Sequence, residues 1–202
     1  MLGYITTGYG SKALSAVQDE VDDYLSKYAL DGFFLDEMAA ALSPDDLTLN
    51  AGIYNYVKGL DSQYRVIQNP GTIPDEAYMA EPVADVMTMF EDTGAAFQGF
   101  APPAWANGYS PDQFAIMIHS ADQAIMLEAI QNAQTLYHAG LVYVTDATLA
   151  QQFGPYSTLP TYWEQEVDVA APEPSTLLLV GGSLAILAWR KRARTPDRRG
   201  RR

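Results

Sequence analysis

Short runs rich in apolar and β-branched residues recur six times within the first 145 residues of the chain. Successive runs begin about 20 to 32 residues apart, and turn-forming residues lie between them. Runs of this length and composition predict β-strands. The predicted strands are residues 2–7, 32–35, 64–68, 83–90, 114–118 and 141–144.

Several of the intervening segments carry apolar residues at intervals of three or four, which predicts amphipathic helices. The first such face consists of Leu14, Val17, Val21, Tyr24, Leu25 and Tyr28. The second consists of Ile53, Tyr54, Val57 and Leu60, and the third of Ile125, Ile130, Ala133, Leu136 and Tyr137. Strands that alternate with helices favour parallel βα units.

Polar residues follow most of the predicted strands at the carboxyl end. They are Thr6, Thr7 and Tyr9, Asp36 and Glu37, Asn69, Glu91 and Asp92, His119 and Ser120, and Thr145 and Asp146. In a (β/α)8 barrel the active site lies at the carboxyl ends of the strands. A doubly wound sheet gathers its ligands at the same ends, so this pattern alone fits either fold.

Asp36, Glu37 and Glu91 are the candidate catalytic residues. Asp36 and Glu37 end one apolar strand, and Glu91 ends another two strands later. Side chains alternate along a strand, so Asp36 and Glu37 are expected to point in different directions. Glycoside hydrolysis needs one carboxyl group to protonate the leaving oxygen and a second to attack the anomeric carbon or activate water. The same acids also suit helix caps or solvated loops.

Five further residues are candidates for binding a sugar chain: Tyr9, Asn69, Trp105, His119 and Tyr143. The two tyrosines could stack on sugar faces or simply pack. Trp105 lies in a proline-rich loop after the fourth predicted strand, and His119 could bind a hydroxyl group or serve a structural role. Asn69 precedes Pro-Gly and could also set a turn. No spacing in the sequence argues for a bound metal or cofactor.

The charge distribution excludes nucleic acid as a partner. Residues 1–170 contain four basic side chains against 23 acids, which gives 4 − 23 = −19. Phosphate binding needs clustered lysine and arginine, which this part of the chain lacks. The absence of cysteine excludes disulfides and thiolate metal sites.

The composition changes abruptly near residue 170. Pro172-Glu173-Pro174 leads into residues 176–189, which carry no charge, and a basic cluster at 190–194 follows. This order resembles the PEP-CTERM sorting signal. The resemblance implies an exported protein, transiently anchored in the inner membrane by a short C-terminal hydrophobic helix. It also implies an exosortase-type peptidase as a partner and a final place at the cell surface or outside the cell. The uncharged run is shorter than the roughly 20 residues that span a bilayer, so it would need tilt or local thinning.

Several motifs along the body occur in the order of the spherulin-4-like family, which the chain resembles over nearly all of residues 2–166. They are residues 3–10 (GYITTGYG), 32–37 (GFFLDE), 69–71, 90–91, 118–120, 144–146 and 155–163 (PYSTLPTYW). The resemblance implies a (β/α)8 glycosidase acting on α-1,4-linked galactosamine or N-acetylgalactosamine polymers. The family's acidic residues match Asp36, Glu37 and Glu91.

The family pattern has two further βα units before the segment at residues 3–10, and no signal peptide precedes that segment here. We therefore expect residues 1–168 to form a (β/α)8 barrel lacking its first two βα units, and residues 169–202 to form the sorting tail. The leading hypothesis is an exported hydrolase of an amino-sugar exopolysaccharide. The alternatives are a surface carbohydrate-binding or matrix protein without turnover, and an inactive truncated remnant.

Overall fold

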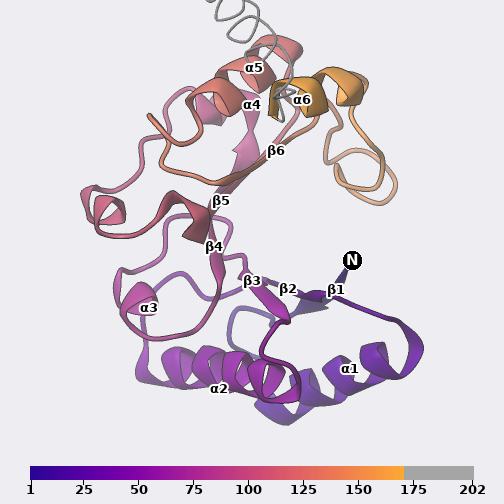
Figure 1. The fold of residues 1–202 in the computed structure, drawn as a ribbon, viewed down its shortest axis with the longest axis vertical. Coiled ribbons are helices and arrows are strands. Elements are labelled where there is room, and N and C mark those ends of the chain that lie inside the picture. The colour runs from indigo at the N-terminus through magenta and orange to yellow at the C-terminus, as the bar shows by residue number, and fades with distance from the viewer. Residues whose placement is uncertain (171–202) are drawn as a thin grey trace, which may run out of the picture.

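The computed structural model describes residues 1–170 and shows a parallel sheet with helices packed against one face (Figure 1). The six strands follow one another in chain order across the sheet. They are β1 (Leu2–Thr6), β2 (Gly32–Asp36), β3 (Arg65–Gln68), β4 (Val86–Thr93), β5 (Phe114–His119) and β6 (Leu141–Val144).

The connections between the strands contain the helices α1 (Leu14–Lys27), α2 (Pro44–Leu60), α3 (Ala77–Ala80), α4 (Gly94–Phe97) and α5 (Gln123–Asn132). Helix α6 (Trp163–Ala170) follows the last strand. Two short 3-10 helices, η1 (Ala104–Gly108) and η2 (Pro111–Gln113), precede β5. The predicted alternation of strands and helices is confirmed, and every pair of neighbouring strands is parallel.

The helix side of β1 to β3 is closed by α1 and α2. Phe33 and Leu35 of β2 are fully buried there, against Val17 of α1 and Val57 of α2. Because alternate residues of a strand face opposite ways, this burial places Phe34 and Asp36 on the other face of the sheet. The burial of one face thus determines which side chains of β2 are available to a site.

Local signals set the starts of α2 and α5. The Ser43 side chain accepts a hydrogen bond from the Asp46 amide at 3.0 Å, and Pro44 occupies the first turn of α2. The Asp122 side chain likewise accepts from the Ile125 amide at 3.0 Å at the start of α5. Such caps satisfy backbone donors that the first helical turn leaves free.

Helix α5 ends at Asn132, before the end of the predicted apolar face. Tyr137 instead packs on Phe97, with the ring centroids 4.6 Å apart, and its hydroxyl donates to Glu128 at 2.8 Å. Leu136 is exposed. The chain therefore turns after residue 132 so that Tyr137 can enter the core, and the prediction of a longer helix was wrong.

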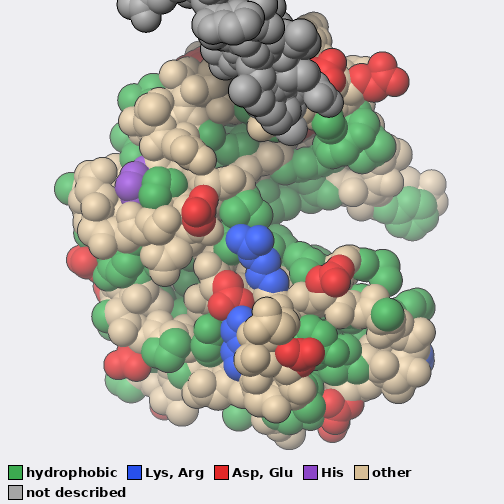
Figure 2. Space-filling view, in the orientation of Figure 1, with side chains coloured by type: hydrophobic (Ala, Val, Ile, Leu, Met, Phe, Trp, Pro, Cys, Tyr) green, Lys and Arg blue, Asp and Glu red, His purple; other side chains and the backbone are tan. Residues whose placement is uncertain are grey.

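The inner face of the sheet, the face away from the helices, is open within residues 1–170. Strands β1 and β6 form its two edges. A cavity of about 270 Å³ lies on this face, lined mainly by apolar side chains that include Phe34, Ile67, Ala115 and Leu141. Figure 2 shows a broad hollow between the part of the molecule that carries α6 and the part that carries β1 and α1. The six strands and their order agree with the prediction, and the described residues show no closed barrel.

The predicted C-terminal hydrophobic helix and sorting tail lie outside the described residues. Among residues 1–170, no helix combines the length and the apolar character that a bilayer crossing requires.

Candidate functional site

Asp36 stands at the carboxyl end of β2 on the inner face, and three donors surround its side chain. Asp36 Oδ1 accepts from the Glu37 amide at 2.8 Å and from Asn69 Nδ2 at 2.9 Å. Asp36 Oδ2 accepts from the Tyr4 hydroxyl at 2.6 Å. Three neutral donors thus occupy both oxygens of the Asp36 carboxyl group and fix its orientation.

Glu91 reaches the same face because β4 contains a β-bulge. Thr88 pairs with Ala115 of β5, but the next pair involves Phe90 instead of Met89. Met89 is therefore an extra residue in the strand, and it shifts the alternation of all residues after it. If the same residues paired with β5 without the bulge, Thr88 would still line the inner face but Glu91 would point toward the helices.

Asn69 joins the two carboxylates from the strand between them. Its Nδ2 atom donates to Asp36 Oδ1 and, at 2.5 Å, to Glu91 Oε2. Its Oδ1 atom accepts from the Gly71 amide at 3.0 Å, which fixes the direction of the amide group. Asn69 is 1% exposed. Asp36, Asn69 and Glu91 form what we call the carboxylate–amide cluster.

Glu37 lies next to the carboxylate–amide cluster, in the loop after β2. Its backbone has a φ of 57°, a left-handed conformation that is uncommon for a residue with a side chain. Its carbonyl accepts from the Tyr9 amide at 2.6 Å and from the Thr7 hydroxyl at 2.8 Å. Its carboxylate accepts from the Thr6 hydroxyl of the neighbouring strand. The Glu37 side chain thus turns toward β1. The sequence predicted that the side chains of Asp36 and Glu37 would point in different directions, and Glu37 contacts the neighbouring strand.

Tyr4 belongs to the site although the sequence analysis did not select it. Burial and then the hydrogen bond to Asp36 raise the pKa of the Tyr4 phenol above its ordinary value, and the charges of Glu37 and Glu91 act in the same direction. The phenol therefore remains a neutral donor. The signal was present in the sequence, because Tyr4 lies two residues before Thr6 and so shares its face of β1.

Tyr156 also reaches the site, from the loop between β6 and α6. Its hydroxyl oxygen is buried, and burial followed by the negative charge of Glu91 raises the pKa of its phenol. Its ring lies 5.9 Å from that of Tyr143, on β6. Asp146 ties the two ends of the loop together by accepting from the Thr161 amide at 3.1 Å and its hydroxyl at 2.5 Å.

The other predicted binding residues divide into two groups. Tyr143 lines the inner face, and His119 ends β5 with its Nδ1 atom 3.0 Å from the Ser120 hydroxyl. Tyr9 is 64% exposed in the loop after β1. Trp105, by contrast, packs against Phe114, the first residue of β5, with the ring centroids 6.0 Å apart. The structure does not bring Trp105 to the carboxyl ends of the strands.

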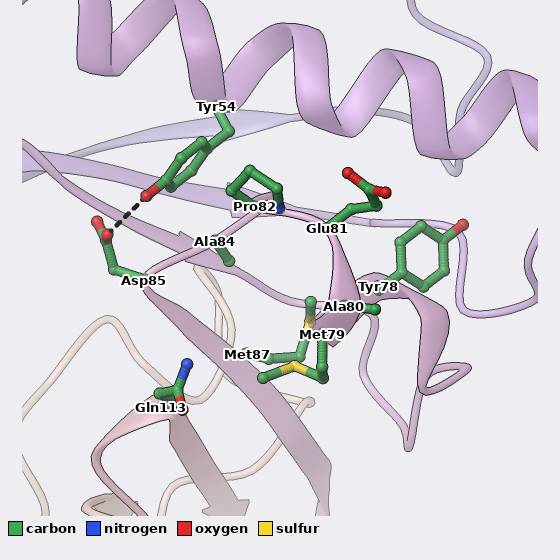
Figure 3. Close-up of a pocket in the computed structure, with 10 residues that line it drawn as sticks. All are labelled: Tyr54, Tyr78, Met79, Ala80, Glu81, Pro82, Ala84, Asp85, Met87 and Gln113. Atoms are coloured by element: carbon green, nitrogen blue, oxygen red, sulfur yellow. Dashed lines mark hydrogen bonds between the residues drawn. The ribbon is translucent and has the colours of Figure 1, made fainter. Parts of the chain in front are cut away.

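A separate cavity of about 400 Å³ lies near the start of β4, beside α2 and α3 (Figure 3). Asp85 and Glu81 are the two acidic residues that line it. The Asp85 carboxylate accepts from the Tyr54 hydroxyl at 3.2 Å and the Val66 amide at 2.8 Å, and it pairs with Lys58 at 2.6 Å. These contacts hold α2 against the sheet, so Asp85 is engaged structurally. Among residues 1–170, no group of three acidic or histidine side chains is placed to hold a metal ion.

We expect Asn69→Asp to lower the free energy of unfolding by about 1–3 kcal/mol near neutral pH, because it removes one donor and places a third carboxylate between two others. The measurement is chemical denaturation followed by circular dichroism. Asn55→Asp on the exposed face of α2 is the matched control. Equal stabilities for the two variants would show that the amide does not hold the two carboxylates together.

The fold and the cluster define a class: a parallel α/β protein with paired carboxylates at the carboxyl ends of its strands. The family model described as "Spherulation-specific family 4" matches residues 1–170. The chain belongs to this family. A second model, the PEP-CTERM protein-sorting motif, matches residues 170–193 and marks the chain as an exported protein.

Two relatives cover most of the chain. Spherulin-4 of Physarum polycephalum is 34% identical over 174 residues, which are 82% of this chain and 51% of that protein. The chain therefore spans about half the length of spherulin-4. The crystal structure of Aspergillus clavatus Sph3 in complex with GalNAc is similar with a TM-score of 0.70 and 25% identity. That likeness covers 84% of this chain and 71% of Sph3.

Proposed function

We propose that the protein is an exported glycoside hydrolase that cleaves an amino-sugar polysaccharide, with α-1,4-linked galactosamine or N-acetylgalactosamine as the sugar. The observation that carries the proposal is the single amide of Asn69, which donates to both Asp36 and Glu91. It holds two carboxylates from different strands at one place, as glycoside hydrolysis requires.

In this proposal the two carboxylates have different roles because their surroundings differ. Asp36 receives three hydrogen bonds and acts as the ionised group, either nucleophile or stabiliser of positive charge at the anomeric carbon. Glu91 receives one hydrogen bond, from Asn69, among the described residues. It acts as the general acid, giving its proton to the glycosidic oxygen as the C–O bond breaks, and afterwards as the base. Glu37 tunes or positions the pair.

The substrate class is supported by the similarity to Sph3, whose structure holds GalNAc. Tyr9, His119 and Tyr143 are the side chains we propose for contacts with the sugar chain, together with Asn69. The aromatic rings offer apolar faces, and His119 offers a ring nitrogen to a hydroxyl group. Trp105 is left out of the site because it packs at the other end of β5.

We further propose that residues 1–168 supply six of the eight βα units of a barrel and that residues 169–202 form a sorting tail. The sequential order of the parallel strands supports the first part. The match to the PEP-CTERM motif supports the second. In this proposal the hydrophobic run at 176–189 enters the inner membrane transiently, before an exosortase-type peptidase acts on the tail.

Incubation of the purified protein with α-1,4-linked galactosamine and N-acetylgalactosamine polymers tests the function. New reducing ends and shortened chains are the expected result, and Glu91→Gln should prevent both. Polymer binding without product, unchanged by Glu91→Gln, would identify a surface carbohydrate-binding or matrix protein instead. Aggregation or the lack of a cooperative melt would identify an inactive remnant.

A further inference from the structure

Tyr156 carries a buried hydroxyl oxygen without a hydrogen bond of standard geometry among residues 1–170. This oxygen is inaccessible to solvent. An unpaired buried hydroxyl group is costly, so such groups usually have a partner in the functional state of a protein. Glu91 lies beside this hydroxyl: after burial, the charge of Glu91 and then a loose hydrogen-bonding contact with its carboxylate raise the pKa of the Tyr156 phenol.

The surroundings of Glu91 leave room for one more donor. Glu91 Oε2 accepts from Asn69, and Glu91 has no other side-chain hydrogen bond within the described residues. The charged and titratable groups around it are Asp36 and Glu37 after β2, Tyr4 on β1, His119 at the end of β5, and Tyr143 and Tyr156 from β6 and its loop. Two of these groups, Tyr4 and Tyr156, are phenols with a hydroxyl close to a carboxylate, and Tyr4 is already engaged with Asp36.

We propose that Tyr156 is a positioning residue, which donates a hydrogen bond to the Glu91 carboxylate once Glu91 has released its proton. The inference rests on the proposed function. In the step concerned, the proton of Glu91 passes to the glycosidic oxygen, the C–O bond breaks, and Glu91 becomes an anion. The Tyr156 phenol keeps its own proton and donates a hydrogen bond to that anion.

The properties of Tyr156 suit this role. Burial raises the pKa of its phenol, so the group is neutral and remains a donor over the range in which carboxyl groups titrate. The loop that carries it is held at its ends by the bonds between Asp146 and Thr161. Within the loop, the Ser157 hydroxyl donates to the Gly154 carbonyl at 2.9 Å. Two sets of contacts thus place the Tyr156 ring above the inner face, beside Tyr143.

The test is the titration of the Glu91 carboxyl group in the full chain. Carbon NMR of labelled glutamate monitors the titration, and Glu91→Gln assigns the Glu91 resonance. A donor to the anion favours ionisation, so Tyr156→Phe should move the titration midpoint of Glu91 to higher pH, by about one unit. The basic limb of the pH–rate profile should move the same way, because the acid then stays protonated to higher pH. Tyr56→Phe removes a hydroxyl that bonds Asp22 on the helix side, and it should change neither measurement.

A reciprocal measurement covers the case in which Tyr156→Phe does not fold. In the native chain with labelled tyrosine, the Cζ resonance of Tyr156 should shift as the Glu91 carboxyl group titrates, and in Glu91→Gln that shift should be absent. An unmoved midpoint of Glu91 in a folded Tyr156→Phe variant, or a Tyr156 resonance that behaves alike in the native chain and in Glu91→Gln, would overturn the inference. If the native chain cleaves no polymer but both effects are seen, the contact stands and the proposed hydrolysis fails.

Discussion

Glu91→Gln should reduce kcat/KM for the polymer by about 10²–10⁴-fold, the usual contribution of a positioned proton donor. Glutamine retains a carbonyl oxygen that can accept the hydrogen bond from Asn69, so the local geometry should survive. It has no acidic proton to give to the leaving oxygen. The measurement is the initial rate of reducing-end formation, and binding of the polymer should be largely retained.

The leaving group separates the role of Glu91 from that of Asp36. A nitrophenyl glycoside of the same sugar has a leaving group that departs without a proton. Glu91→Gln should therefore lose much less activity on this substrate than on the polymer, whereas Asp36→Asn should lose activity on both. Equal losses for Asp36→Asn, Glu37→Gln and Glu91→Gln on both substrates would remove the basis for separate roles.

Gly32→Ala should unfold the protein or lower its free energy of unfolding by about 4 kcal/mol or more. Gly32 begins β2 with a φ of 147°, and an added Cβ atom would lie 1.9 Å from the Arg65 carbonyl oxygen. Arg65 is its direct partner in β3, so relief would require the two strands to separate. The measurement is chemical denaturation followed by circular dichroism.

Gly59→Ala is the matched control for this effect. Gly59 lies within α2, and no atom of the described residues lies within 4 Å of an added Cβ atom. Alanine is the better helix former, so the variant should be as stable as the native chain or more stable, by up to about 1 kcal/mol. Similar losses in both variants would show that the close approach of β2 and β3 is not the cause.

The order of the elements and the carboxylates were predictable because both depend on local pattern. The run of apolar residues before Asp36 predicts a buried strand, and the carboxyl ends of parallel strands must meet at one edge of the sheet. Phe33 and Leu35, which pack on the helices, determine the face of Asp36. The prediction that Glu91 would lie near Asp36 agrees with the structure. The sequence did not predict the bulge in β4, which turns Glu91 to the inner face.

The positions of Tyr156 and Trp105 depend on the paths of loops, which the periodicity of the sequence does not describe. Tyr156 lies 12 positions after the end of β6, and contacts such as the bonds between Asp146 and Thr161 bring its loop back over the sheet. The loop that contains Trp105 leaves the carboxyl end of β4 and must return to the amino end of β5. Trp105 occurs late in that path and so packs on Phe114.

The bulge at Met89 changes how members of this family should be compared. A relative that lacks the extra residue between Thr88 and Phe90 would still present the glutamate aligned with Glu91 on the inner face, because regular alternation leads there from Thr88 in two steps. A relative that keeps the residue but pairs without a bulge would turn the same glutamate toward the helices. The face that this glutamate occupies therefore depends on how β4 pairs with β5, which an alignment of residue identities does not supply.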